Sequence, residues 1–143
     1  MPYRYLEDIA TADVAFEAWG DTVEEVFISS ADATMNVMVE DLNTIHNRER
    51  RNIKVDAEAL DMLLFQLLQE LVYYKDAEQL LLRIPQVHIE EEDGRFTLGA
   101  EAYGEPLNVL KHDLIVDVKA VTLHKFRVEQ RARGWEATVI LDI

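Results

Sequence analysis

The sequence contains no cysteine, which excludes disulfide bonds, thiolate metal ligands and catalysis by a cysteine nucleophile. Glycine and proline are also scarce, with 5 and 3 residues among 143, and neither a flexible linker nor a low-complexity segment is present. Hydrophobic residues, in contrast, make up 49% of the chain. A chain of this length and composition can bury a sizeable core, so we expect a single domain over residues 1–143.

The sequence also lacks long apolar runs. None approaches the ~20 residues that a membrane-spanning helix requires, so we expect no membrane partner. The N-terminal stretch MPYRYLED has no apolar core of the kind found in secretory signal peptides. Together with the absence of cysteine, which fits a reducing compartment, these features predict a cytoplasmic protein.

Basic residues are few, since 14 lysines and arginines stand against 28 aspartates and glutamates, for a net charge of −14. Nucleic-acid binders use cationic side chains to displace counterions from phosphates, so we expect no direct high-affinity binding of RNA or DNA. An acidic surface suits basic protein partners or hard cations, although it also simply increases solubility.

Two segments have the periodicity of helices. The first begins after Asp21, where Thr22 and Glu25 form a capping-box pattern. The second starts near Asp56 and contains a wide leucine-rich stripe suited to packing on a sheet. The stripe consists of Leu60, Leu63, Leu64, Leu67, Leu68, Leu71 and Val72.

Most of the remaining chain has strand-like patterns. The expected strands are residues 3–9, 14–20, 51–55, 78–90, 95–105, 114–131 and 135–143. The turn between the expected strands 78–90 and 95–105 contains Gly94, which can take a positive φ. Two helices and strands in hairpin order predict an α+β fold. We expect a two-layer sandwich in which a largely antiparallel sheet carries both helices on one face.

Three carboxylates are candidates for binding a hard cation. Asp13 lies in the expected turn between the first two strands, while Asp142 and the terminal carboxylate of Ile143 end the last strand. Ca²⁺ and Mg²⁺ prefer oxygen ligands, and the three groups could converge if the last strand lies beside the first ones. Taken alone, Asp13 is equally explained as a turn residue, because aspartate is common in turns.

Other polar residues suggest an alternative, enzymatic function. His112 and His124 could form an acid–base pair, because imidazole titrates near neutral pH, and with Asp13 they would suit a metal-dependent hydrolase. No nucleophile or orienting group accompanies them, and ordinary solvent-facing or hydrogen-bonded histidines explain the pattern as well. Glu105, between Gly104 and Pro106, is typical of a turn, and alternation predicts that Lys119 shares a face with Val121 and Leu123.

Several short stretches, taken in their order along the chain, resemble the archease family. They are TADVAFEAWG, DTVEEVF, LLFQLLQELVYYKD, GE, KH, VKAVTLH and the final LDI, and the resemblance extends from Leu6 to Ile143. Archeases are accessory proteins, and not enzymes, of the GTP-dependent RNA-splicing ligase that acts in tRNA splicing. The resemblance therefore implies a protein that promotes guanylylation of the ligase histidine and multiple turnover.

The resemblance also implies a site and a second partner. A divalent cation, Ca²⁺ first with Mg²⁺ or Mn²⁺ as alternatives, would be held by Asp13, Asp142 and Ile143, with Glu105 and Lys119 as helpers nearby. The other implied function is that of an acidic, chaperone-like modulator of a tRNA cytosine methyltransferase. The family's fold is a two-layer α+β sandwich, in agreement with the pattern of helices and strands.

This sequence departs from the family pattern at three positions. The histidine that usually precedes Thr11 is Ala10, so any role of that imidazole is missing, whereas the three oxygen ligands are retained. In the second helix, Leu67 replaces a common tryptophan and Gln69 replaces an asparagine. Both helix changes are compatible with a packed apolar stripe.

Overall fold

The computed structural model describes residues 2–6 and 13–143 of the chain. Over these residues two helices, one short 3-10 helix and eight strands follow one another in a mixed order. The elements are β1 (Tyr3–Leu6), β2 (Asp13–Gly20), α1 (Val23–Met38), η1 (Leu42–Thr44), β3 (Glu49–Ala57), α2 (Leu60–Glu78), β4 (Leu80–Arg83), β5 (Val87–Glu92), β6 (Arg95–Pro106), β7 (Ala120–Arg131) and β8 (Gly134–Asp142).

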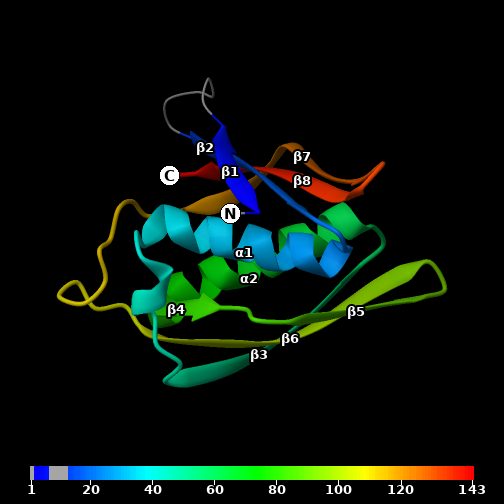
Figure 1. Ribbon diagram of the computed structural model, residues 1–143. Coiled ribbons are helices and arrows are strands. Elements are labelled where there is room, and N and C mark those ends of the chain that lie inside the picture. Colours follow the sequence, from blue (N-terminus) through cyan, green and yellow to red (C-terminus); the bar gives the residue numbers. More distant parts are fainter. Residues whose placement is uncertain (1, 7–12) are drawn as a thin grey trace.

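The strands of the described residues form two antiparallel sheets, with the helices between them (Figure 1). One sheet has the order β1-β2-β8-β7, and in the other β6 pairs with β3 on one edge and with β4 and β5 on the opposite edge. Helix α1 contacts β2 and β8 of the first sheet on one side and β4 and β5 of the second sheet on the other. Helix α2 likewise contacts β7 of the first sheet and β3 of the second. The predicted α+β class, with two helices and antiparallel strands, is confirmed. The strands divide between two sheets, each of which carries the helix pair on one of its faces.

Helix α1 can lie between two sheets because it is buried around most of its circumference. Besides its apolar side chains, the small residues Ser29, Ser30 and Ala33 are buried and allow close approach on the second side. The predicted capping box is confirmed, since the Thr22 hydroxyl accepts a hydrogen bond from the Glu25 backbone N–H and the Glu25 carboxylate accepts one from the Thr22 backbone N–H.

Helix α2 contributes a leucine-rich face to the core. Its predicted stripe is confirmed, with Leu60 only partly buried and the six other residues buried. The predicted start near Asp56 is wrong, because β3 continues to Ala57 and the helix begins at Leu60. The helix ends at Glu78, and the next residue, Gln79, caps it in a left-handed conformation with φ of 52°.

Most of the predicted strands are present with adjusted limits. The first is described as far as Leu6, and residues 7–9 and the turn residues 10–12 lie outside the described part of the chain. The prediction of one continuous strand over 78–90 is wrong, because the strand structure is interrupted around Pro85, between β4 and β5. The expected turn is confirmed, with Gly94 at a φ of 77°.

The segment before β7 does not form the strand that its apolar sequence predicts. Strand β7 begins at Ala120, not at Leu114, and the preceding residues pair with the rest of the described chain only through a bridge between Leu114 and Val39. Ala120 pairs with Asp142, the last residue of β8, so the residues before Ala120 extend past the end of that strand and have no described strand beside them to pair with. None of the described helices is long and apolar enough to cross a membrane.

The buried leucines of α2 determine the stability of the fold. We expect Leu64→Ala to lower the free energy of unfolding by about 2–5 kcal/mol, because it removes buried methyl groups and leaves a cavity between the sheets. Urea unfolding followed by circular dichroism measures the change. Gln69→Ala on the exposed side of the same helix is the control, and equal losses in the two variants would contradict this account of the core.

Candidate functional site

The two predicted aspartate ligands lie opposite each other on neighbouring strands. Asp13 is the first residue of β2 and Asp142 the last of β8, and the antiparallel register pairs them directly. Directly opposite residues project from the same face of a sheet with Cβ atoms about 4.5–5.5 Å apart. Ile143 follows Asp142, and all three residues are partly buried. The structure therefore brings Asp13 and Asp142 together from opposite ends of the chain.

This carboxylate pair has no cationic partner within the described residues. None of the ion pairs found there involves Asp13 or Asp142. Within the described residues, no group of three or more histidine, aspartate or glutamate side chains is placed so that it could hold a metal ion. Like charges directly opposite each other are destabilising, so a cation bound between the two carboxylates would relieve their repulsion.

The donor atoms at this edge fit a hard divalent cation. Asp13 and Asp142 offer only carboxylate oxygens, and Ile143, the third predicted ligand, directly follows Asp142. Oxygen-only donor sets suit Ca²⁺, Mg²⁺ or Mn²⁺, whereas zinc sites usually include imidazole or thiolate. Partial burial leaves room for water to complete the ligand shell of such an ion.

Lys119 is placed beside this edge by a main-chain hydrogen bond. Its backbone N–H donates to the Asp142 carbonyl at 2.8 Å, immediately before β7 begins at Ala120. The predicted alternation holds only for part of this strand. Val121 is buried, whereas Lys119 and Leu123 are exposed, and the register shifts between Thr122 and Arg127.

A second cluster surrounds Glu105, whose side chain is buried with only 4% of its residue surface exposed. The carboxylate accepts hydrogen bonds from the His46 backbone N–H at 2.8 Å, from Lys111 Nζ at 2.8 Å and from His112 Nε2 at 3.1 Å. Burial alone would raise the pKa of Glu105, but the bonds from Lys111, His46 and His112 outweigh it and hold the pKa at about 2. Glu105 is therefore ionised in the folded protein at neutral pH.

His112 is bound on both ring nitrogens. Its Nδ1 accepts a hydrogen bond from the Asn108 backbone N–H at 3.0 Å, so the ring proton lies on Nε2 and is donated to Glu105. His124 is exposed on β7, and the described hydrogen bonds do not connect the two rings. The structure therefore does not support the predicted acid–base pair of His112 and His124.

The partners of Glu105 are not apparent from the sequence. The Gly-Glu-Pro stretch is typical of a turn, yet Glu105 lies in β6 opposite Leu81. Gly104 allows this close packing, because a Cβ there would collide with the Leu81 carbonyl oxygen. The closely spaced Glu105, Lys111 and His112 were the only available signal, and nothing in the sequence indicated the contribution of the His46 backbone.

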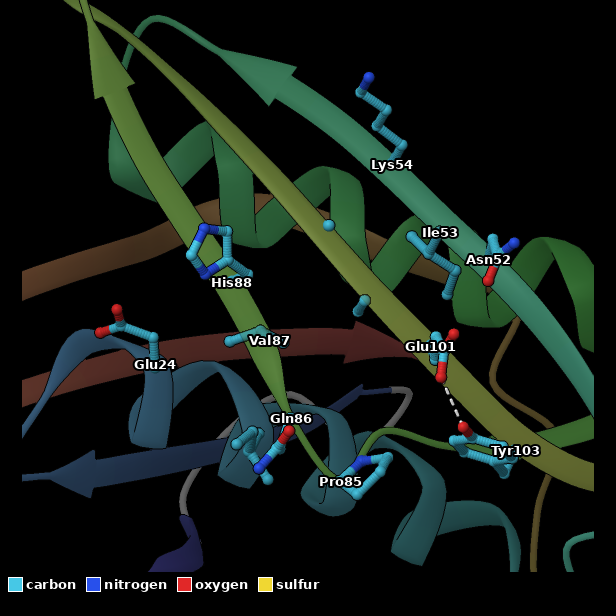
Figure 2. Close-up of a pocket in the computed structure, with 13 residues that line it drawn as sticks. Glu24, Asn52, Ile53, Lys54, Pro85, Gln86, Val87, His88, Glu101 and Tyr103 are labelled. Carbon is cyan, nitrogen blue, oxygen red and sulfur yellow. Dashed lines mark hydrogen bonds between the residues drawn. The ribbon is translucent and has the colours of Figure 1, made fainter.

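A groove of about 820 Å³ on the described structure contains none of the predicted ligands. Figure 2 shows it beside β3, β5 and β6, with His88, Lys54 and Glu101 among the polar residues that line it. The Tyr103 hydroxyl donates to Glu101 at 2.6 Å. Lys54 and His88 lie on either side of Gly99 in the strand register, which leaves the centre of this surface without a side chain.

Comparison with known proteins identifies the family. The sequence model of the Archease protein family matches residues 3–143. Protein archease of Pyrococcus abyssi is 37% identical over 134 residues, which cover 93% of this chain and 94% of that protein. This chain belongs to the archease family. Protein archease of Methanosarcina mazei is likewise 37% identical, over 142 residues that cover 99% and 95% of the two chains.

Solved structures agree with the family assignment. The solution structure of protein 1598 of Methanobacterium thermoautotrophicum matches with a TM-score of 0.85 and 31% identity, covering 99% of both chains. The crystal structure of an archease from Thermotoga maritima matches with a TM-score of 0.60 and 18% identity, covering 98% of both chains. The second likeness supports the fold alone. The predicted resemblance to archease, and the fold that it implied, are confirmed.

The depressed pKa of Glu105 makes its contribution to stability depend on pH. A carboxylate whose pKa falls from 4.5 in the unfolded chain to about 2 in the folded one stabilises the fold above about pH 4.5. This contribution is lost as the pH falls through about 2. We expect Glu105→Gln to lower the free energy of unfolding by about 1–3 kcal/mol at neutral pH, with a smaller difference in acid.

Urea unfolding of Glu105→Gln and the wild type near pH 7 and near pH 3 measures this effect. Glu91→Gln, a change of the same type at an exposed position of β5, is the control. A difference between Glu105→Gln and the wild type that stays constant over the whole pH range would contradict the assigned ionisation.

Proposed function

We propose that this archease is an accessory factor of the GTP-dependent RNA-splicing ligase and promotes guanylylation of the ligase histidine and multiple turnover. The carboxylate pair of Asp13 and Asp142 carries the proposal, together with membership of the family. In this proposal the two side chains and the terminal carboxylate of Ile143 hold a divalent cation, with Ca²⁺ the first candidate and Mg²⁺ or Mn²⁺ the alternatives.

The rigidity of the sheet supports a role in positioning. Strand β8 lies between β2 and β7, and Val139, Ile140 and Leu141 are buried immediately before Asp142. Asp142 is therefore held by strands on both sides and cannot move independently of Asp13. A bound divalent cation would neutralise negative charge on phosphate groups. The two aspartates would hold the positive charge of the cation at a fixed place on the surface.

The net charge of −14 supports an approach to a cationic site on a partner. A ligase that binds GTP and RNA needs positive charge around its active site, and opposite net charges accelerate association. In this proposal Lys119, fixed next to Asp142, adds one local positive charge at the edge that would meet the anionic nucleotide. The protein itself carries out no reaction; it assists the ligase.

A second candidate function is that of a chaperone-like modulator of a tRNA cytosine methyltransferase. The Thermotoga maritima protein of the same fold is described as a possible chaperone. Exposed apolar residues such as Leu110 and Ile115 favour this candidate too, because they offer a surface for binding another protein. In that function a cation at Asp13 and Asp142 would stabilise the sheet edge without affecting RNA joining.

The proposed metal site leads to a prediction that does not depend on the ligase. We expect a single Ca²⁺ to bind, and saturation at about 100 times the dissociation constant to raise the melting temperature by about 5–10 °C, because the ion binds only the folded edge. Calorimetric titration with CaCl₂ and melting with and without chelator measure both effects. Asp142→Asn is expected to lose them, whereas Glu91→Gln keeps them; Ca²⁺ binding by Asp142→Asn equal to the wild type would place the ion elsewhere.

The ligase proposal is tested by RNA joining with limiting ligase from the same organism. We expect the wild type to raise the product well above one equivalent per ligase, and Asp13→Ala to reduce this stimulation tenfold or more, or about 1.4 kcal/mol. Glu91→Ala is the control for loss of one acidic side chain. If the wild type leaves the yield unchanged, the ligase function fails; if Asp13→Ala stimulates fully, the carboxylate pair is not required.

A further inference from the structure

Residues 107–119, between β6 and β7, expose several large apolar side chains. We call these residues the 107–119 segment; it lies on the same side of the molecule as the C-terminus (Figure 1). Leu110 is 95% exposed and Val109 72% exposed. Leu114, Ile115 and Val116 are exposed as well. Apolar side chains gathered on one irregular segment of a charged protein mark a surface for binding another molecule.

The tip of this segment is fixed by hydrogen bonds. The Asn108 carbonyl accepts from the backbone N–H groups of Lys111 and His112 at 3.0 and 2.8 Å, and the Asn108 side chain accepts from the Leu110 N–H at 2.9 Å. Lys111 and His112 are in turn bound to the buried carboxylate of Glu105. Leu110 is therefore exposed on an ordered turn, and its exposure does not result from a frayed loop.

The rest of the segment is attached to both helices. The Ile115 N–H donates to the Met38 carbonyl at 2.9 Å, at the end of α1. Lys75 of α2, itself buried, donates to the Asp117 carboxylate at 2.5 Å and to the Val118 carbonyl at 2.8 Å. A surface held in this way loses little conformational entropy when a partner binds, which favours affinity.

A cavity of about 220 Å³ opens beneath the exposed side chains. Its lining is mainly apolar and includes Leu107, Leu114 and Val116 from the segment, with Met38 and Leu81 behind them. The segment thus offers a projecting apolar group at Leu110 and an apolar cavity next to Leu114. Buried apolar contacts of this kind form the energetic centre of protein–protein interfaces.

The charges next to these apolar groups indicate the chemistry of the partner. Asp76, Asp113 and Asp117 are exposed next to these apolar groups. Of the two lysines of the segment, Lys111 is partly buried and paired with a buried carboxylate, and Lys119 lies at the far end, next to the carboxylate pair. A second copy of this chain would bring like charges together at a net charge of −14 each, and anionic lipids or nucleic acids would be repelled as well. The fitting partner is a protein surface with an apolar socket and lysine or arginine around it.

We propose that the 107–119 segment is the docking surface for such a protein, and that this partner is the ligase, an identification that rests on the proposed function. The segment ends at Lys119, whose N–H donates to the Asp142 carbonyl. Docking through Leu110 and the neighbouring cavity therefore fixes the direction in which the carboxylate pair of Asp13 and Asp142 faces the partner. Affinity comes from the segment, and the effect on turnover comes from the carboxylates.

Titration of ligase turnover separates these two roles. We expect Leu110→Ser to raise the concentration of this protein needed for half-maximal stimulation tenfold or more, with unchanged turnover at saturation. Asp13→Ala is expected to bind with nearly unchanged affinity and to fail to stimulate at any concentration. Leu123→Ser, which also replaces an exposed leucine, is the control and is expected to match the wild type. Circular dichroism and melting confirm that each variant is folded.

Direct binding to immobilised ligase distinguishes failure of this inference from failure of the proposed function. Suppose that the wild type stimulates the ligase, and that Leu110→Ser has the same affinity for the ligase and the same half-maximal concentration for stimulation. This result would overturn the proposed docking surface but not the proposed ligase function. Leu110-dependent binding without any stimulation would support docking and refute the ligase-activator function. A dimer in sedimentation experiments that Leu110→Ser dissociates would instead show that a second copy occupies the segment.

Discussion

Burial of the helix pair between two sheets is the constraint on which the rest of the molecule depends. Leu63, Leu64 and Leu67 of α2 lie in the space between β7 and the opposite sheet, and removal of the apolar surface of the whole core from water supplies most of the driving force for folding. The same packing fixes β8 in the middle of its sheet, because its inward side chains lie against α1. The position of the final residues, and with it the proposed metal edge, follows from this core.

How much could be predicted from the sequence depended on how local the deciding interactions are. The capping box at Thr22, the leucine stripe of α2 and the turn at Gly94 are each set by residues close in sequence, and all three were predicted. The division into two sheets was not predicted, because it depends on small residues such as Ser30 that a hydrophobic pattern does not register. The limits of β7 were missed for a related reason, since apolar residues form a strand only where a partner edge is available.

In the candidate site, too, the residue types could be predicted from the sequence but their contacts could not. Asp13 and Asp142 could be named as potential ligands from residue type and family resemblance, but their pairing depends on the register of β2 with β8, which joins distant parts of the chain. The cluster around Glu105 gave a weaker signal. Its donors come from His46 before β3 and from Lys111 and His112 after β6, and only the fold shows that they meet one buried carboxylate.

That buried carboxylate connects the interior to the proposed docking surface. An ionised group in a protein interior is tolerated only when hydrogen bonds replace its lost hydration, and Glu105 obtains them from residues of the 107–119 segment. The need to satisfy Glu105 therefore holds the segment in one conformation, with Leu110 outward. Because Lys119 at the other end is bound to Asp142, the same chain of contacts leads from Glu105 to the carboxylate pair. A partner that binds the segment would consequently meet the aspartates in a fixed orientation, which is the condition for a metal-bearing edge to act on another protein's active site.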